Sequence, residues 1–164
     1  MNDDYNEYDK PLILVVDDEF LQRLPMCEAL SQGGFRVLEA EDGVDAWALI
    51  REESPDLVIS DVIMPRMDGF ELCQMIRGAE KLQHLPIVLA TSLDDLSSIE
   101  HAYRLGATDF ITKPINWSLL GHRIRSDFLI PRSFQLALFR RILHQFVNQF
   151  ISRLRVAELD LVQF

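Results

Sequence analysis

The chain has 164 residues, about half of them hydrophobic, a formal net charge of −10 and only two cysteines, Cys27 and Cys73. This composition is typical of one globular domain and excludes a disulfide scaffold or a disordered chain. No apolar run approaches the roughly 18 residues of a membrane span, and the acidic N-terminus is the reverse of a signal peptide, so we expect a cytoplasmic protein. Residues 1–120 hold 23 acidic and 9 basic side chains. This excess disfavours direct binding to nucleic acid, because phosphate contacts supply most non-specific affinity.

Short apolar runs alternate with helical patterns from Pro11 onward, after an acidic tail at residues 1–10 that we expect to be flexible. In chain order, the patterns predict a strand at 12–16, a helix at 20–32 that Pro25 should bend or loosen, a strand at 35–40, a helix at 44–53, a strand at 57–60, a helix at 70–77, a strand at 87–90, a helix at 96–105, a strand at 110–112 and a helix at 118–129. This alternation predicts an α/β fold, a doubly wound sheet of five parallel strands in the flavodoxin-like order 2-1-3-4-5. We expect the domain to cover residues 11–130.

Both cysteines lie in apolar helical patterns and are expected as buried free thiols.

Polar side chains follow the carboxyl ends of four predicted strands. Asp17 and Asp18 follow the first strand, Asp61 the third, Thr91 the fourth and Lys113 the fifth. In doubly wound sheets the ligand site lies at this edge, so we expect these side chains to converge there. Any one of them could merely cap a helix or face water, but such a convergence is not typical of solvated residues.

The expected cluster has the chemistry of a phosphoryl-transfer site. Three carboxylates a few ångströms apart repel one another, and a hard divalent cation such as Mg²⁺ would neutralise them through oxygen ligands. A cation, an ammonium from Lys113 and a hydroxyl from Thr91 can together hold the oxygens of a phosphoryl group. Asp61 stands alone at the end of the expected central strand, so it is the best candidate for a nucleophile that forms an aspartyl phosphate.

Five segments of the sequence carry a family resemblance: residues 13–19 (ILVVDDE), 61–69 (DVIMPRMDG), 89–92 (LATS), 106–110 (GATDF) and 112–114 (TKP). In this order and spacing they resemble the receiver domain of two-component response regulators, over residues 11 to about 130. The stretch at 92–117 looks most like receivers that precede diguanylate cyclase domains, although the Gly-Gly-Asp/Glu-Glu-Phe signature of such cyclases occurs nowhere in the sequence. The chain is therefore expected to be either a stand-alone receiver or a piece of a longer regulator.

The resemblance implies a role for each residue of the cluster. Asp61 would accept a phosphoryl group from a histidine kinase or a phosphotransfer protein, and Lys113 would pair with the phosphoryl oxygens. Mg²⁺ would be held by Asp17, Asp18, Asp61 and the backbone carbonyl of Ile63. The implied chemistry is limited to the domain's own phosphorylation and dephosphorylation, so we expect a signalling module and not an enzyme.

Other residues are implied to convert phosphorylation into a change of surface. Thr91 would move to hydrogen-bond the phosphoryl group, and Phe110 would swing inward behind it. The peptide bond between Lys113 and Pro114 would be cis, which aims the lysine into the site. These movements would alter the face formed by the fourth helix, the fifth strand and the fifth helix, which could bind a protein partner or a second copy of the chain.

Two apolar residues near the expected site predict slow loss of the phosphoryl group. Ile63 lies two residues after Asp61, and Leu93 lies two residues after Thr91. Some relatives carry polar side chains at these positions that help water to attack. We therefore expect slow autodephosphorylation.

Residues 131–164 form a separate amphipathic helical pattern, with apolar positions three and four apart. Three roles remain open: a helix packed on its own domain, a helix for dimerisation or partner docking, and a helix on a membrane surface. A DNA-recognition helix is disfavoured because the segment lacks a helix-turn-helix partner. No known output domain is recognised there.

Two other functions are compatible with parts of the pattern. A Mg²⁺-dependent phosphohydrolase with an aspartate nucleophile generally has Asp-x-Asp after its first strand, whereas here two aspartates are adjacent and Asp61 lies on a later strand. A degenerate receiver used only for binding or dimerisation would not need the intact set of acidic, hydroxyl and lysine side chains. The sequence identifies neither the cognate kinase nor the downstream partner.

Overall fold

The structure is a computed structural model that describes residues 10–92 and 96–129. In these ranges, five strands alternate with five α-helices, and a short 3₁₀ helix follows the third α-helix. The strands are β1 (Leu12–Val16), β2 (Arg36–Ala40), β3 (Leu57–Asp61), β4 (Ile87–Thr91) and β5 (Asp109–Thr112). The helices are α1 (Phe20–Gln32), α2 (Gly43–Glu53), α3 (Gly69–Gly78), the 3₁₀ helix η2 (Glu80–Leu82), α4 (Leu96–Arg104) and α5 (Trp117–Leu129).

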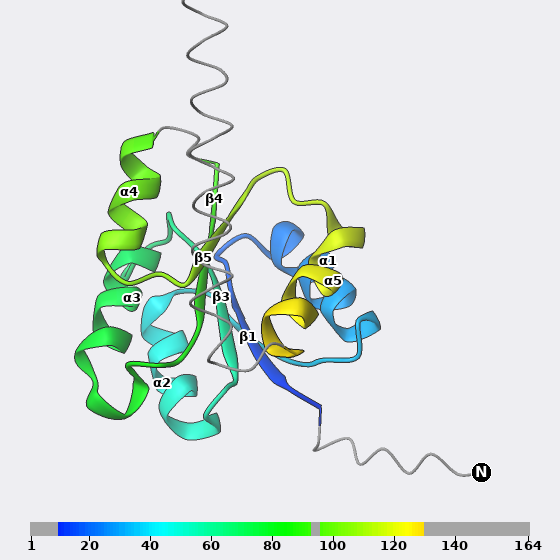
Figure 1. Ribbon diagram of the computed structural model, residues 1–164, viewed down its shortest axis with the longest axis horizontal. Coiled ribbons are helices and arrows are strands. Elements are labelled where there is room, and N and C mark those ends of the chain that lie inside the picture. The colour runs from blue at the N-terminus through cyan, green and yellow to red at the C-terminus, as the bar shows by residue number, and fades with distance from the viewer. Residues whose placement is uncertain (1–9, 93–95, 130–164) are drawn as a thin grey trace, which may run out of the picture. The chain divides into compact units, whose positions relative to one another are not determined.

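The strands form one parallel sheet in the order β2-β1-β3-β4-β5 (Figure 1), which confirms the predicted flavodoxin-like arrangement. Every residue of β1 and β4 is buried, as expected for inner strands of a sheet that is covered on both faces. The register pairs Val16 with Ser60, and Ser60 with Leu89. The carboxyl ends of β1, β3 and β4 therefore lie side by side.

Helices cover both faces of this sheet. Helices α2, α3 and α4 lie on one face, and α1 with the first residues of α5 lies on the other (Figure 1). The start of α5 packs on α1: a Cβ atom at Gly121 would lie 3.8 Å from the backbone carbonyl oxygen of Ala29 in α1 and 3.7 Å from the Cα atom of Gly33 just after it. The compact unit that contains the sheet ends at His122, within α5. The packing of helices on the sheet described above refers to this unit only.

A hydrophobic core fills the space between the sheet and the helices α2 to α4. Leu14 of β1, Ile50 of α2 and Leu72 of α3 are fully buried in it. Burial of one such side chain stabilises a fold by about 1.5–3 kcal/mol, so this core holds the strand ends in place. Cys27 and Cys73 are both buried and free, as predicted.

The strands match the predicted ones in number and order, and their limits differ by at most one residue. β3 and β4 each run one residue further than predicted, to Asp61 and Thr91. The reason is that the pairing continues: Asp61 pairs with Ala90, and Thr91 pairs with Thr112. The candidate nucleophile is thus part of the sheet and not of the following loop.

The helices also match, with limits that differ from the predicted ones by at most one residue: α3 ends one residue later, α4 ends one residue earlier and α5 begins one residue earlier. α2 and α3 begin one residue earlier than predicted, because the carboxylates of Asp42 and Asp68 accept backbone N–H groups and cap them. Pro25 removes one backbone donor, yet α1 runs unbroken from Phe20 to Gln32. The helix η2 was not predicted.

Some predictions fall outside the described residues. They concern the acidic tail before residue 10, the position of Leu93, and the extension at 131–164 with its three open roles. Among the helices of the described ranges, none is long and apolar enough to cross a membrane.

Candidate functional site

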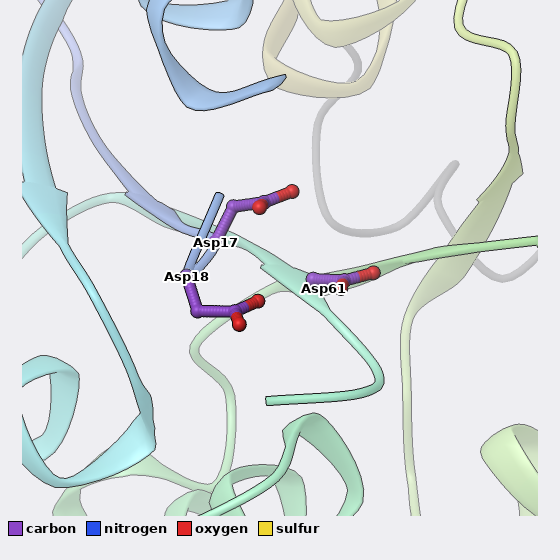
Figure 2. A group of neighbouring side chains, drawn as sticks. All are labelled: Asp17, Asp18 and Asp61. Atoms are coloured by element: carbon purple, nitrogen blue, oxygen red, sulfur yellow. The ribbon is translucent and has the colours of Figure 1, made fainter. Parts of the chain in front are cut away.

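Three aspartates meet at the carboxyl edge of the sheet. Asp17 and Asp18 follow β1, and Asp61 is the last residue of the neighbouring strand β3. One carboxylate oxygen from each lies within 4.8 Å of the other two, and Figure 2 shows the three side chains extending from the strand ends toward the same side. Asp17 is buried, Asp61 is partly buried and Asp18 is exposed. The cluster therefore has a buried base and one side open to solvent.

Lys113 brings a positive charge to this cluster from the loop after β5. Its Nζ atom lies 2.9 Å from Oδ1 of Asp61 and 3.1 Å from Oδ2 of Asp17. Its backbone N–H donates to the carbonyl of Thr91 at 2.8 Å, which joins the lysine to the end of β4. The following peptide bond, to Pro114, is cis, as the family resemblance implied.

Burial and pairing act in opposite directions on the charged groups of the site. Burial raises the pKa of Asp61 above its ordinary value; the bond with Lys113 opposes this rise, and the charge of Asp17 adds to it. Burial by itself would lower the pKa of Lys113, but the bonds with Asp61 and Asp17 outweigh it, and the pKa of the lysine is raised. Lys113 is thus held in its charged form, while an ionised Asp61 is less well stabilised than a solvated carboxylate.

The donor set of the cluster fits a hard divalent cation. Three carboxylates face one ammonium, so the cluster has an excess of negative charge that a cation would neutralise. Oxygen ligands suit Mg²⁺, which keeps several of its waters, and the exposed Asp18 leaves one side open to them. Two hydrogen bonds help to orient the Asp17 carboxylate: Oδ1 accepts the N–H of Glu19 at 2.9 Å, and Oδ2 accepts Lys113.

The other predicted residues that the structure describes lie on β4, on β5 and just after β3. Thr91 is buried at the end of β4, the strand next to β3. Ile63, two residues beyond Asp61, is 64% exposed. Phe110 lies in β5 with its ring centroid 5.8 Å from that of Tyr103, edge to face. Their roles in binding a phosphoryl group, ligating a metal and switching remain predictions.

Two contacts of the site were not foreseen from the sequence. A Cβ atom at Gly69 would collide with the carbonyl oxygen of Asp61, so the start of α3 packs directly on the strand end. The guanidinium of Arg23, on α1, donates to the carbonyl oxygen of Asp17 at 2.6 Å. Gly69 is the last residue of the 61–69 motif, so the motif could have identified it as a residue of the site. The signal for Arg23 is a charge on the apolar stripe that continues through Met26 and Leu30.

Comparison with known families identifies the kind of domain that carries these three aspartates. The sequence matches the family model of the response regulator receiver domain over residues 13–125. The chain belongs to this family. This receiver is therefore a signalling domain of the two-component type. Members of the family take a phosphoryl group, bind Mg²⁺ at an acidic pocket and interact with histidine kinases.

Individual relatives agree with this assignment. The receiver is 40% identical over 120 residues to "Probable transcriptional regulator ycf27" of Cyanophora paradoxa, a match that covers 73% of this chain and 49% of that protein. It is 39% identical over 115 residues to "Response regulator PleD" of Caulobacter vibrioides, covering 70% of this chain and 25% of that protein. The chain thus spans about half the length, or less, of these curated relatives.

Solved structures show the same fold. The chemotaxis response regulator CheY4 of Vibrio cholerae superposes with a TM-score of 0.68 at 30% identity, covering 71% of this chain and 98% of that one. The BeF3-activated DrrB receiver domain gives a TM-score of 0.67 at 31% identity, covering 74% of this chain and 99% of that one. The α/β fold predicted from the sequence is confirmed.

Proposed function

We propose that Asp61 is the phosphoacceptor of this receiver. In the proposed reaction, a carboxylate oxygen of Asp61 forms a bond to phosphorus, the bond between phosphorus and the donor imidazole nitrogen breaks, and its electron pair stays on the imidazole. The observation that supports Asp61 is that its carboxylate lies beside the other two carboxylates and has one oxygen 2.9 Å from the ammonium of Lys113. This placement puts a nucleophile beside a positive charge that can receive phosphoryl oxygens.

We further propose Mg²⁺ as the cofactor, held by Asp17, Asp18, Asp61 and the backbone carbonyl of Ile63. When bound, the ion would neutralise negative charge on the carboxylates and on the phosphoryl oxygens. The chain's own groups perform the remaining tasks. Lys113 pairs with the phosphoryl oxygens, and the hydrogen bonds to both oxygens of Asp17 hold that side chain in place.

The proposed output is a change of protein contacts. Thr91 moves to hydrogen-bond the phosphoryl group and Phe110 turns inward, which alters the face formed by α4, β5 and the start of α5. The donor is a histidine kinase or a phosphotransfer protein in the cytoplasm. The receiver acts on no substrate beyond its own Asp61. Regulation of transcription is stated in the names of some relatives, and for this chain the downstream partner is proposed only as a protein.

Covalent labelling tests the phosphoacceptor. The wild-type chain is incubated with acetyl phosphate, with and without Mg²⁺, and phosphate is located by intact and peptide mass spectrometry. We expect one phosphate on Asp61, dependent on Mg²⁺, and none on the Asp61→Asn variant. Asp56→Asn is the matched control. Asp56 lies directly before β3, at the end of the strand opposite to Asp61, and its carboxylate accepts the backbone N–H of Leu12. Phosphate on another residue, or turnover of the phosphate ester without a stable adduct, would contradict the proposal.

Light-scattering mass tests how the change is read out. Wild type and Asp61→Asn are compared with and without Mg²⁺ and beryllofluoride, which mimics the phosphoryl group. A mass change that needs Asp61 would show that the receiver signals through self-association. An unchanged mass, with binding of beryllofluoride demonstrated by tryptophan fluorescence, would assign the readout to a different protein. No binding at all would favour a passive receiver.

A further inference from the structure

Arg23 is a charged side chain on the buried face of α1. It is only 6% exposed, and it shares this face with Met26, Cys27 and Leu30. A buried guanidinium is tolerated only when its donors are satisfied and its charge is paired. The contacts of Arg23 therefore show what it does in the fold.

The guanidinium of Arg23 joins three segments of the chain. One terminal N–H group donates to the carbonyl oxygen of Asp17 at 2.6 Å. The Nε–H group donates to a carboxylate oxygen of Glu39 at 3.0 Å, and the second terminal nitrogen lies 3.5 Å from a carboxylate oxygen of Glu41. Two nitrogens of the planar guanidinium thus contact β2 and the loop after it, and the third donates to the residue that follows β1.

The bond to the carbonyl of Asp17 acts on both acidic residues after β1. The carbonyl of Asp17 and the N–H of Asp18 belong to one rigid peptide plane, so a bond that fixes the carbonyl also limits where the side chain of Asp18 can point. Every polar atom of Asp17 is engaged: its N–H donates to Ala40 at 3.2 Å, its carbonyl accepts Arg23, and its carboxylate accepts Glu19 and Lys113. Asp18 is exposed, so we expect this backbone to set the direction of its side chain.

We infer that Arg23 is a positioning residue for the Mg²⁺ ligands: it fixes the peptide between Asp17 and Asp18 and so orients both carboxylates toward Asp61. This inference rests on the proposed function, because it assumes that these carboxylates bind the ion. It assigns a role in the site to a residue of α1 that contacts neither the phosphoacceptor nor a carboxylate of the cluster.

Charge and positioning predict opposite effects when Arg23 is replaced. The positive charge of Arg23 repels a nearby cation, so a purely electrostatic role predicts that Arg23→Gln binds Mg²⁺ more tightly. A positioning role predicts weaker binding, because the peptide plane is released. Arg23→Lys keeps the charge but loses the fork, so only positioning predicts a change in that variant.

The experiment measures the Mg²⁺ dissociation constant of the full chain by isothermal titration calorimetry. We expect Arg23→Lys and Arg23→Gln to bind Mg²⁺ about tenfold more weakly than wild type, the usual loss when a supporting residue of a metal site is replaced. Arg51→Lys is the matched control, since Arg51 is exposed in the last turn of α2, and it should bind as wild type does. In Mg²⁺-free protein, the backbone N–H of Glu19, which donates to Asp17, should exchange with deuterium faster in the Arg23 variants.

Each outcome supports or overturns the inference. Equal or tighter Mg²⁺ binding by folded Arg23 variants overturns it while leaving the proposed function intact. Failure of the wild-type chain to bind Mg²⁺ overturns the proposed function and this role with it. If the variants do not fold, nitrogen NMR of the wild-type guanidinium decides: slow exchange of the Arg23 N–H bonded to Asp17 supports the inference, and rapid exchange overturns it.

Discussion

The carboxylate of Asp61 is partly removed from solvent, which disfavours its charged form. Its side chain is 13% exposed, and burial raises its pKa. Lys113 offsets part of this effect, whereas Asp17 adds a like charge beside it. The burial of Asp61 and the like charge of Asp17 therefore destabilise the metal-free fold when Asp61 is ionised.

The first prediction concerns the stability of Asp61→Asn in EDTA. Because the pKa of Asp61 is raised in the fold, the folded state binds its proton more tightly than the unfolded chain does, and ionisation disfavours folding. We expect the variant to have a higher thermal midpoint than wild type at pH 7. The difference should shrink as the pH falls through the raised pKa and vanish below about pH 4, the ordinary pKa of an aspartate. A lower midpoint for Asp61→Asn at neutral pH would contradict the electrostatic account.

The second prediction concerns Ile63, whose exposed apolar side chain lies two residues after Asp61. It offers no hydrogen bond to a water attacking the phosphoryl group, so we expect the phosphorylated receiver to lose phosphate slowly. Ile63→Asn should lose it faster, by about tenfold, because an amide can orient the water. Phosphate release is followed after removal of acetyl phosphate. A half-life of only seconds for the wild-type chain would sink this prediction.

At the level of elements, the segment after β3 is held between the starts of two helices. The capping box of α3 pairs Asp68 with Glu71, and Gly69 packs on the carbonyl of Asp61. On the other side, the N–H of Gly43, at the start of α2, donates to the carbonyl of Met67 at 3.0 Å. These contacts fix the backbone that carries both Asp61 and the carbonyl of Ile63.

The third prediction tests this close approach with Gly69→Ala. The added methyl group would collide with the carbonyl oxygen of Asp61, so the strand end or the helix must shift. We expect a loss of about 1–3 kcal/mol in the free energy of unfolding, measured with urea, and weaker Mg²⁺ binding. The control is Gly78→Ala in the same helix, where a Cβ atom meets nothing within 4 Å. It should be neutral or stabilising by up to about 1 kcal/mol. Equal effects of the two substitutions would show that the contact with Asp61 is unimportant.

Across the whole molecule, the site is assembled from segments that only the folded sheet brings together. The ion pair between Lys113 and Asp17 joins residues 96 positions apart in the chain. A cation held by carboxylates from β1 and β3 would likewise bind the folded chain and not the unfolded one. Metal binding and folding would therefore be linked.

The fourth prediction follows from this linkage. Mg²⁺ at a hundredfold excess over its dissociation constant should stabilise the receiver by about 2.7 kcal/mol, seen as a higher thermal midpoint. Asp18→Asn should lose most of this gain while changing the metal-free stability little, because Asp18 is exposed. If Mg²⁺ raised the midpoints of wild type and Asp18→Asn equally, it would be acting elsewhere on the chain.

The sequence by itself determined the order of the elements, the order of the strands and the edge of the sheet that holds the polar cluster. These features depend on local patterns and on general rules: apolar runs form inner strands, crossovers are right-handed, and the carboxyl ends of parallel strands share one edge. The positions of Asp17, Asp18 and Asp61 at that edge could be predicted for this reason.

Only the tertiary structure decided how the site is held. The double pairing of Lys113 and the bond from Arg23 to the Asp17 carbonyl depend on where side chains from different elements end in space. The contact of Arg23 was not predicted from the sequence, because a lone arginine in a helix is usually a solvated residue. Its partners are Asp17 just after β1, Glu39 on β2 and Glu41 in the loop after β2, and their proximity is a result of packing that no local pattern encodes.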